Sequence, residues 1–206
     1  MARIGVVADT HCPEFLERLP EGVFAALAGS DLVLHAGDVN GPGTLEALRR
    51  IGPVRAVRGD HDHELPDLPD HLELEVEGRR IVLVHGNRSR WREEPQTFLW
   101  TISLGHYRPH KRLSAALRRR FPTADVIVHG HTHTPLIDRS GKPLVFNPGG
   151  VFQWTPVTAA ARLRRRPGWF EWCWLQVARH IRSHPEPTVG VLEITPSGIE
   201  PRIVAL

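Results

Sequence analysis

The stretch RIGVVADTH, residues 3–11, decides the fold class of this chain. Residues 3–8 form a short β-branched run, which predicts a buried strand that ends at Asp9. His11 follows two positions later, and in an extended segment the side chains of Asp9 and His11 point to the same face. A carboxylate and an imidazole at the end of a buried strand are typical of a binding or catalytic site at the edge of a sheet.

Two further apolar runs repeat this pattern. DLVLHA at 31–36 is followed by Gly-Asp, and PVRAVR at 53–58 is also followed by Gly-Asp. We expect helices between these strands, at 14–28 and 43–51. A strand–helix–strand–helix–strand order predicts an α/β fold with parallel strands and right-handed crossovers.

The rest of the chain predicts a second set of strands and two interruptions. We expect one domain of 206 residues. The segments 88–121 and 151–187 read as insertions, both with helical parts. The remaining apolar segments predict a hairpin at 72–77 and 80–84, strands at 125–129 and 143–146, and a closing hairpin at 188–195 and 199–205.

Acidic residues and histidines follow one predicted strand after another. In parallel α/β sheets the carboxyl ends of the strands meet at one edge, where ligands bind. Nitrogen and oxygen donors without a cysteine pair favour Mn, Fe, Ni or Zn over a structural zinc site. The candidates exceed what one ion needs, so two metal ions fit better. They are Asp9, His11, Asp38, Asp60, His61, His85, His131 and His133.

The ordered motifs Asp9-x-His11, Gly37-Asp38, Gly59-Asp60-His61-Asp62, His85-Gly86 and Gly130-His131-Thr132-His133 carry a family resemblance. Together they resemble the calcineurin-like metallophosphoesterases, in particular their small bacterial and archaeal phosphodiesterases. The resemblance implies a four-layer α/β/β/α sandwich, with a Trp-rich helical insertion near the C-terminus as a departure. Five motifs in the family's order make the match specific between residue 3 and about residue 150.

The resemblance also implies a ligand set and a reaction. A hydroxide bridging two divalent metal ions, Mn first among the candidates, would attack the phosphorus of a phosphate ester. Asp38 would bridge the two ions. The implied ligands of the first metal are Asp9, His11 and His133, and those of the second are Asp60, His85 and His131.

Three residues of the Gly-Asp-His-Asp motif need separate interpretation. Position 60 is usually Asn in the family, so Asp60 would add a negative charge at the second metal. His61 resembles the residue that contacts the phosphate or protonates the leaving group, and a phosphate contact alone remains an alternative. Asp62 resembles the family's partner that orients this histidine.

Other functions remain open on the same site. We expect a small phosphodiester or nucleotide substrate, with a phosphomonoesterase or a dinucleoside-polyphosphate hydrolase as the alternative. A non-catalytic metal-binding scaffold of the same fold is an alternative of another class. We do not expect nucleic acid as a partner, because 206 residues leave little room for additional binding segments.

Composition and the N-terminal sequence bear on the cellular compartment of the protein. The formal net charge is +3, and no stretch of about 18 apolar residues predicts a membrane span, so we expect no membrane partner. The N-terminus does not read as a signal peptide. Two cysteines cannot form a disulfide framework, so we expect a cytoplasmic protein.

The insertions carry no part of the motif pattern. A helix is expected at 169–182, where Phe170, Cys173 and Trp174 share one face. It would pack on the sandwich or form a homodimer contact, since exposed aromatic residues mark interfaces. The stretch 105–112 reads as a solvated loop or a phosphate grip, and Arg118 to Arg120 as a solvated helix face.

Overall fold

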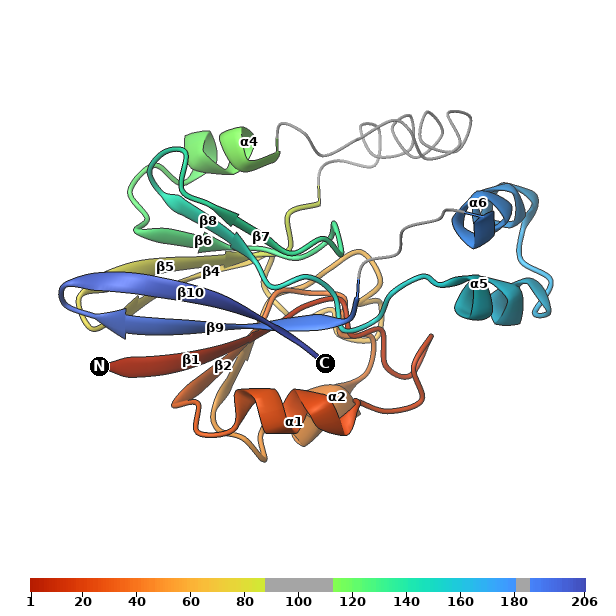
Figure 1. Ribbon diagram of the computed structural model, residues 1–206, viewed down its shortest axis with the longest axis horizontal. Coiled ribbons are helices and arrows are strands. Elements are labelled where there is room, and N and C mark those ends of the chain that lie inside the picture. Colours follow the sequence, from red (N-terminus) through yellow and green to blue (C-terminus); the bar gives the residue numbers. More distant parts are fainter. Residues whose placement is uncertain (88–112, 181–185) are drawn as a thin grey trace. The chain divides into compact units, whose positions relative to one another are not determined.

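The computed structural model describes residues 1–87, 113–180 and 186–206, and its parts are shown in Figure 1. The chain forms two compact units. The first holds residues 1–86, 112–152 and 186–206, and the second holds 87–111 and 153–185. Each is described here by itself. That the chain is one domain stays a prediction.

The first sheet of the first unit confirms the parallel core. Its order is β10-β9-β1-β2-β3. Strands β1, β2 and β3 pair in parallel, and the closing hairpin of β9 and β10 adds antiparallel strands beside β1. Its strands are β1 (Ala2–Val7), β2 (Leu32–His35), β3 (Val54–Ala56), β9 (Thr188–Thr195) and β10 (Gly198–Ala205).

The second sheet has the order β4-β5-β6-β8-β7. Strands β5, β6 and β8 are parallel, and β4 and β7 pair antiparallel at the two edges. The short edge strand β7 has no strong sequence signal, because two of its three residues are exposed. The strands are β4 (His71–Val76), β5 (Arg79–Val84), β6 (Val126–Val128), β7 (Leu136–Asp138) and β8 (Leu144–Asn147).

Alternation along β1 explains the four layers. Ile4 and Val6 belong to the apolar cluster shared by the two sheets, whereas Val7 packs with the helices α1 (Glu21–Leu27) and α2 (Pro42–Leu48). On the other sheet, α4 (Leu113–Arg120) packs through Leu113 and Leu117. Figure 1 shows α1 and α2 outside β1 and β2, and α4 outside β6 and β8. The predicted α/β/β/α sandwich is therefore confirmed.

Two predicted boundaries differ from the structure. The helix expected at 14–28 begins only at Glu21, after Pro20 in extended conformation, because residues 11–16 form a turn instead. The insertion expected at 88–121 ends earlier, since the apolar side of α4 belongs to the sandwich. The stretch 105–112 lies outside the described residues.

The described part of the second unit is a pair of helices, α5 (Pro156–Leu163) and α6 (Trp169–His180). A capping box at Thr155 begins α5. Arg162 Nε donates to Glu171 Oε1 over 2.7 Å, and the rings of Trp154 and Trp174 meet edge to face. These contacts tie the two helices together.

The buried side of α6 is not the stripe that the sequence predicts. Leu175 and Ala178 are buried, whereas Phe170 is exposed. Trp169 and Trp172 are 79% and 48% exposed. The helix therefore keeps aromatic surface exposed.

No helix among the described residues is long and apolar enough to cross a membrane.

The sequence predicts Arg118 on a solvated helix face, but its side chain makes several contacts within the fold. Its guanidinium donates to the carbonyls of Pro143 and Asp138 and lies 3.0 Å from the Asp138 carboxylate. The hydrogen bond from Arg118, with others from Ser140, holds the pKa of Asp138 well below its ordinary value. The pair ties α4 to the edge strand β7.

We expect Asp138→Asn to lower the free energy of unfolding by about 1 kcal/mol at neutral pH. Because the folded carboxylate has the lowered pKa, its stabilisation is complete above its ordinary pKa of about 4. It is lost as the pH falls through the lowered value. Urea unfolding between pH 7 and pH 2.5 measures this loss of stability. The difference in the free energy of unfolding between wild type and Asp138→Asn should narrow only in acid. Asp70→Asn, which removes an exposed ion pair with Arg58, is the control and should change little.

Candidate metal centre

The predicted ligands lie in the loops that follow the strands at one edge of the two sheets. Asp9 follows β1, Asp38 follows β2 and His85 follows β5 directly. Five of the seven have a left-handed backbone, which non-glycine residues rarely adopt and which clusters at functional sites. Their φ angles are 51° at Asp9, 48° at His11, 56° at Asp38, 67° at His131 and 52° at His133.

Asp9, His11 and His133 form the first group. One ligand atom from each lies within 4.8 Å of the others, and His133 Nε2 lies 3.8 Å from Asp9 Oδ1. The carbonyl of Phe152 accepts a hydrogen bond from His133 Nδ1, which leaves Nε2 as the donor atom for a cation. Asp9 is fully buried, and its Oδ2 has no hydrogen-bond partner among the described residues. Such a carboxylate oxygen fits a metal ligand.

Asp60, His85 and His131 form the second group. Asp60 Oδ2 lies 3.3 Å from His131 Nδ1 and 3.9 Å from His85 Nε2. The carbonyl of Ala36 accepts a hydrogen bond from His85 Nδ1 over 2.7 Å, so the Nε2 of this buried ring faces the carboxylates. The same oxygen of Asp60 thus faces both histidines.

Asp38 lies between the two groups. Its Oδ2 is 3.6 Å from His11 Nε2 and 3.4 Å from His85 Nε2, so a single oxygen faces a residue of each group. Burial by itself raises the pKa of Asp38, but the neighbouring His85 and His11 lower it below its ordinary value. Asp38 therefore remains a carboxylate, as a bridging ligand must.

The electrostatics of the site suit a cation. Burial, followed by the neighbouring His133, lowers the pKa of His11 to about 3, so the ring is neutral and has a lone pair to donate. Burial also lowers the pKa of His85, but Asp38 outweighs it and raises the net value. The raised pKa of His85 reflects the carboxylate charge that faces its ring. A divalent cation would balance the same carboxylate charge.

His61 and Asp62 differ from the predicted pair. The backbone N–H of His61 donates to Asp38 Oδ1, and its ring Nδ1 donates to Glu14 Oε2 over 3.1 Å. Asp62 is buried and accepts from the backbone N–H groups of Asp38, Gly59 and Asn40. The structure therefore places Glu14, not Asp62, on the His61 ring, because both oxygens of Asp62 are engaged by backbone amides. The catalytic roles of His61 and Asp62 stay predictions.

A sequence profile of the calcineurin-like phosphoesterase superfamily domain matches residues 2–163. The chain belongs to this superfamily. A probable metallophosphoesterase of Methanothermobacter thermautotrophicus is 33% identical over 147 residues, which cover 71% of this chain and 75% of the relative. Phosphodiesterase YfcE of Escherichia coli is 28% identical over 140 residues, which cover 61% and 67%.

A solved structure shows the same fold. Vps29 of Entamoeba histolytica in complex with Zn²⁺ has a TM-score of 0.63 and 18% identity, and the match covers 98% of each chain. At this identity the likeness concerns the fold alone. Membership in the phosphoesterase superfamily supports a hydrolase of phosphate esters, and the metal dependence of that family fits the two groups of candidate ligands.

Two histidines next to the candidate ligands belong to neither ligand group. Burial lowers the pKa of His35 to about 4, and its Nε2 lies 3.0 Å from the Thr10 hydroxyl. His129 Nδ1 lies 3.0 Å from the Gly130 carbonyl. Asn147 donates to the Gly130 carbonyl and the Thr132 hydroxyl, so it holds the loop that carries His131 and His133.

Sequence reasoning missed Glu14 and Asn40. Glu14 lies at the beginning of the helix that the sequence predicts at 14–28, and its position carries no motif. The structure instead places it in the turn after His11, where its carboxylate accepts hydrogen bonds from Asn40 Nδ2 and His61 Nδ1. The cis bond between Cys12 and Pro13 directly precedes Glu14. Asn40 and His61 are 26 and 47 residues from Glu14 in the sequence, so only the folded structure shows that they are its partners.

Proposed function

We propose that the protein is a two-metal-dependent phosphodiesterase that hydrolyses a small phosphodiester or a nucleotide. The observation that carries this proposal is the position of Asp38 Oδ2, which faces His11 in one ligand group and His85 in the other. A carboxylate shared in this way favours two ions rather than one. The phosphodiesterase-named relative supports a diester as the substrate class.

The roles of the residues follow from their positions. Asp9, His11 and His133 would hold one ion and Asp60, His85 and His131 the other, with Asp38 between them. The bound ions would supply charge to neutralise the phosphate and a water that ionises near neutral pH. Hydrolysis would form a bond from the water oxygen to phosphorus and release one water proton to solvent, while the electron pair of the broken P–O bond would move to the departing alcohol oxygen. His61 would give that oxygen a proton.

The proposal predicts both metal content and substrate preference. Elemental analysis of the purified protein should find two ions per chain, with Mn the first to add back, and Fe, Ni and Zn next. A panel of phosphodiesters, phosphomonoesters and dinucleoside polyphosphates then decides the substrate class. Turnover of monoesters or polyphosphates alone would favour the alternative hydrolases. Metal binding without any turnover would favour a scaffold of the same fold.

We expect Asp60→Asn to weaken retention of the second metal, because an amide oxygen replaces the carboxylate that faces His85 and His131. Activity should return when Mn is in excess, since the amide still offers an oxygen. Dialysis followed by metal analysis and assay measures both effects. Asp67→Asn removes an exposed carboxylate from the same loop and is the charge control. Identical metal affinity in wild type and Asp60→Asn would place Asp60 outside the ligand set.

We also propose a homodimer contact through α6, and a cytoplasmic location. Trp169 and Trp172 are exposed on α6, and tryptophan is enriched in protein contacts. The two cysteines are free, which suits a reducing compartment. Light scattering on the wild type and on a Trp169→Ser, Trp172→Ser variant tests the dimer. A monomeric wild type, or a dimer that persists in the folded variant, would contradict this contact.

A further inference from the structure

A third group of polar side chains lies beside the two ligand groups. It consists of His11, Glu14 and His61, each with one atom within 4.8 Å of the others. Glu14 is not part of any motif that the sequence presents. Its place comes from the turn after His11, in which the backbone N–H of Phe15 donates to the His11 carbonyl. This turn brings Glu14 next to the loop that follows β2.

The contacts of Glu14 distinguish this group from a metal site. A single oxygen, Oε2, accepts hydrogen bonds both from Asn40 Nδ2 and from His61 Nδ1, the latter over 3.1 Å. A metal ion would compete with both hydrogen bonds for this oxygen. The group is therefore a hydrogen-bonded acid–histidine pair, and the His61 hydrogen bond lowers the pKa of Glu14 further into the carboxylate range.

Glu14 is itself held in place. Asn40 has a left-handed backbone with φ of 74°, and its N–H donates to Asp62 Oδ1 over 2.7 Å. Asp62 also accepts from the N–H of Asp38. A chain of hydrogen bonds thus runs from the loop of the bridging carboxylate through Asp62 and Asn40 to Glu14, and ends on the His61 ring.

The His61 ring is then fixed from several sides. Its backbone N–H donates to Asp38, its Nδ1 donates to Glu14, and its ring meets the His11 ring edge to face at 4.8 Å between centroids. A carboxylate can only accept, so Nδ1 carries the hydrogen of this bond. Nε2, on the other side of the ring, is left to act on a substrate.

We propose that Glu14 is the positioning residue of His61: it accepts the Nδ1 hydrogen and fixes the orientation of the ring, so that Nε2, which carries the second hydrogen of the charged ring, can give it to the leaving-group oxygen. This inference rests on the proposed function and names a residue that supports it. Asp62 does not do this work, because its two oxygens already accept three backbone N–H groups. Groups that orient a metal-bound histidine contribute about 10- to 100-fold to affinity or activity, and we expect an effect of the same size at His61.

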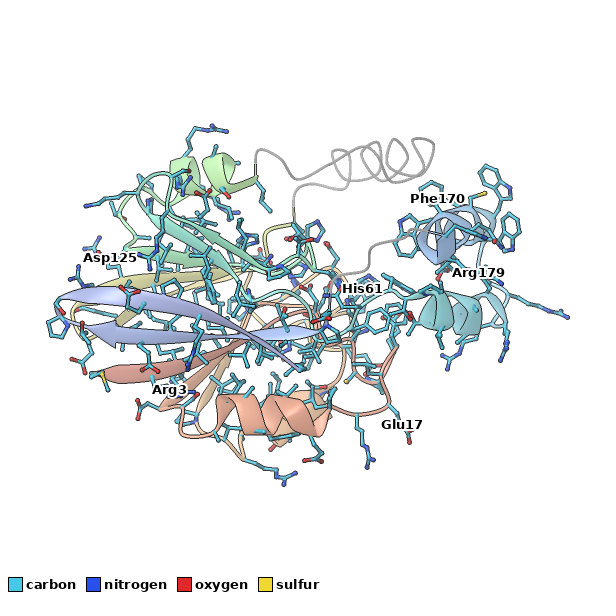
Figure 2. The ribbon with its side chains drawn as sticks, viewed as in Figure 1. Arg3, Glu17, His61, Asp125, Phe170 and Arg179 are labelled. Carbon is cyan, nitrogen blue, oxygen red and sulfur yellow. The ribbon has the colours of Figure 1, made fainter. Side chains whose placement is uncertain are left out.

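The first test measures the ring and not the reaction. Long-range ¹H–¹⁵N spectra of the metal-free protein, assigned with His61→Ala, report which ring nitrogen of His61 carries hydrogen. We expect Nδ1–H in the wild type and in the control Glu17→Gln, whose exposed carboxylate lies on the same segment (Figure 2). Glu14→Ala should lose this preference, and Glu14→Gln should keep it, because its amide oxygen still accepts.

The second test uses kinetics. Glu14→Ala should slow a diester with an alkyl leaving group by about 10- to 100-fold, and a p-nitrophenyl diester far less, with metal content unchanged. In a His61→Ala background the same change should add nothing, because both residues act through one ring. Glu14→Gln should recover most of the loss.

Three results would overturn the proposal. They are an unchanged His61 ring in Glu14→Ala, an equal loss on both esters, and loss of a metal ion from Glu14→Ala. If the wild type hydrolyses no ester, the proposed function fails, whereas the spectra still decide whether Glu14 positions His61. The two failures are therefore distinguishable.

Discussion

Asp38→Asn should lower turnover to below about one hundredth of the wild-type rate, which corresponds to about 2.7 kcal/mol of barrier. The side chain has one oxygen that faces both His11 and His85 and another that accepts the His61 N–H. Asparagine keeps one acceptor oxygen for that N–H but removes the negative charge between the two ligand groups. Two cations would then repel each other without a bridging anion.

The fold of Asp38→Asn should survive, because the residue lies after β2 and outside the apolar clusters. Circular dichroism and urea unfolding check this, and metal analysis should show fewer than two ions per chain. Asp67→Asn, an exposed carboxylate of the first unit, controls for loss of charge and should keep full activity. Retention of more than about a tenth of wild-type turnover by Asp38→Asn would contradict the two-metal assignment.

Asp62→Asn should lower both stability and metal affinity. The buried carboxylate accepts from the N–H groups of Asp38, Asn40 and Gly59, at 3.0, 2.7 and 2.7 Å. An amide presents an NH₂ group to at least one of these donors and leaves it unpaired. We expect a loss of about 2 to 4 kcal/mol in the free energy of unfolding. Metal affinity should fall by about 10- to 100-fold, because the loop of Asp38 is no longer held.

Urea unfolding of the metal-free protein separates this effect from that of the ions, and titration with Mn²⁺ measures the affinity. His61→Ala is the comparison, since it removes the ring but leaves the three backbone hydrogen bonds to Asp62 intact. The role that the sequence suggested for Asp62 makes a different prediction. If Asp62 acts only through His61, the two variants should share one leaving-group effect, with stability changed by less than about 0.5 kcal/mol.

The sequence by itself determined the parts of the fold and site that depend on local pattern. The β-branched runs at 3–8 and 31–36 predicted β1 and β2, because side-chain period and β-branching act over a few residues. Asp9 and His11, like His131 and His133, are two positions apart, so the covalent chain alone keeps each pair close together. Since parallel strands end at a common edge, strand order alone predicted that these residues would meet.

The tertiary structure alone decided which side chains act on one another. Glu14 and His61 are 47 residues apart, and their hydrogen bond depends on how two loops approach, which no local pattern specifies. The same holds for Asp62, whose partners are backbone N–H groups that carry no residue identity. Backbone amides are the same at every position, so the sequence cannot show which of them a buried carboxylate will accept from; only the folded loops can.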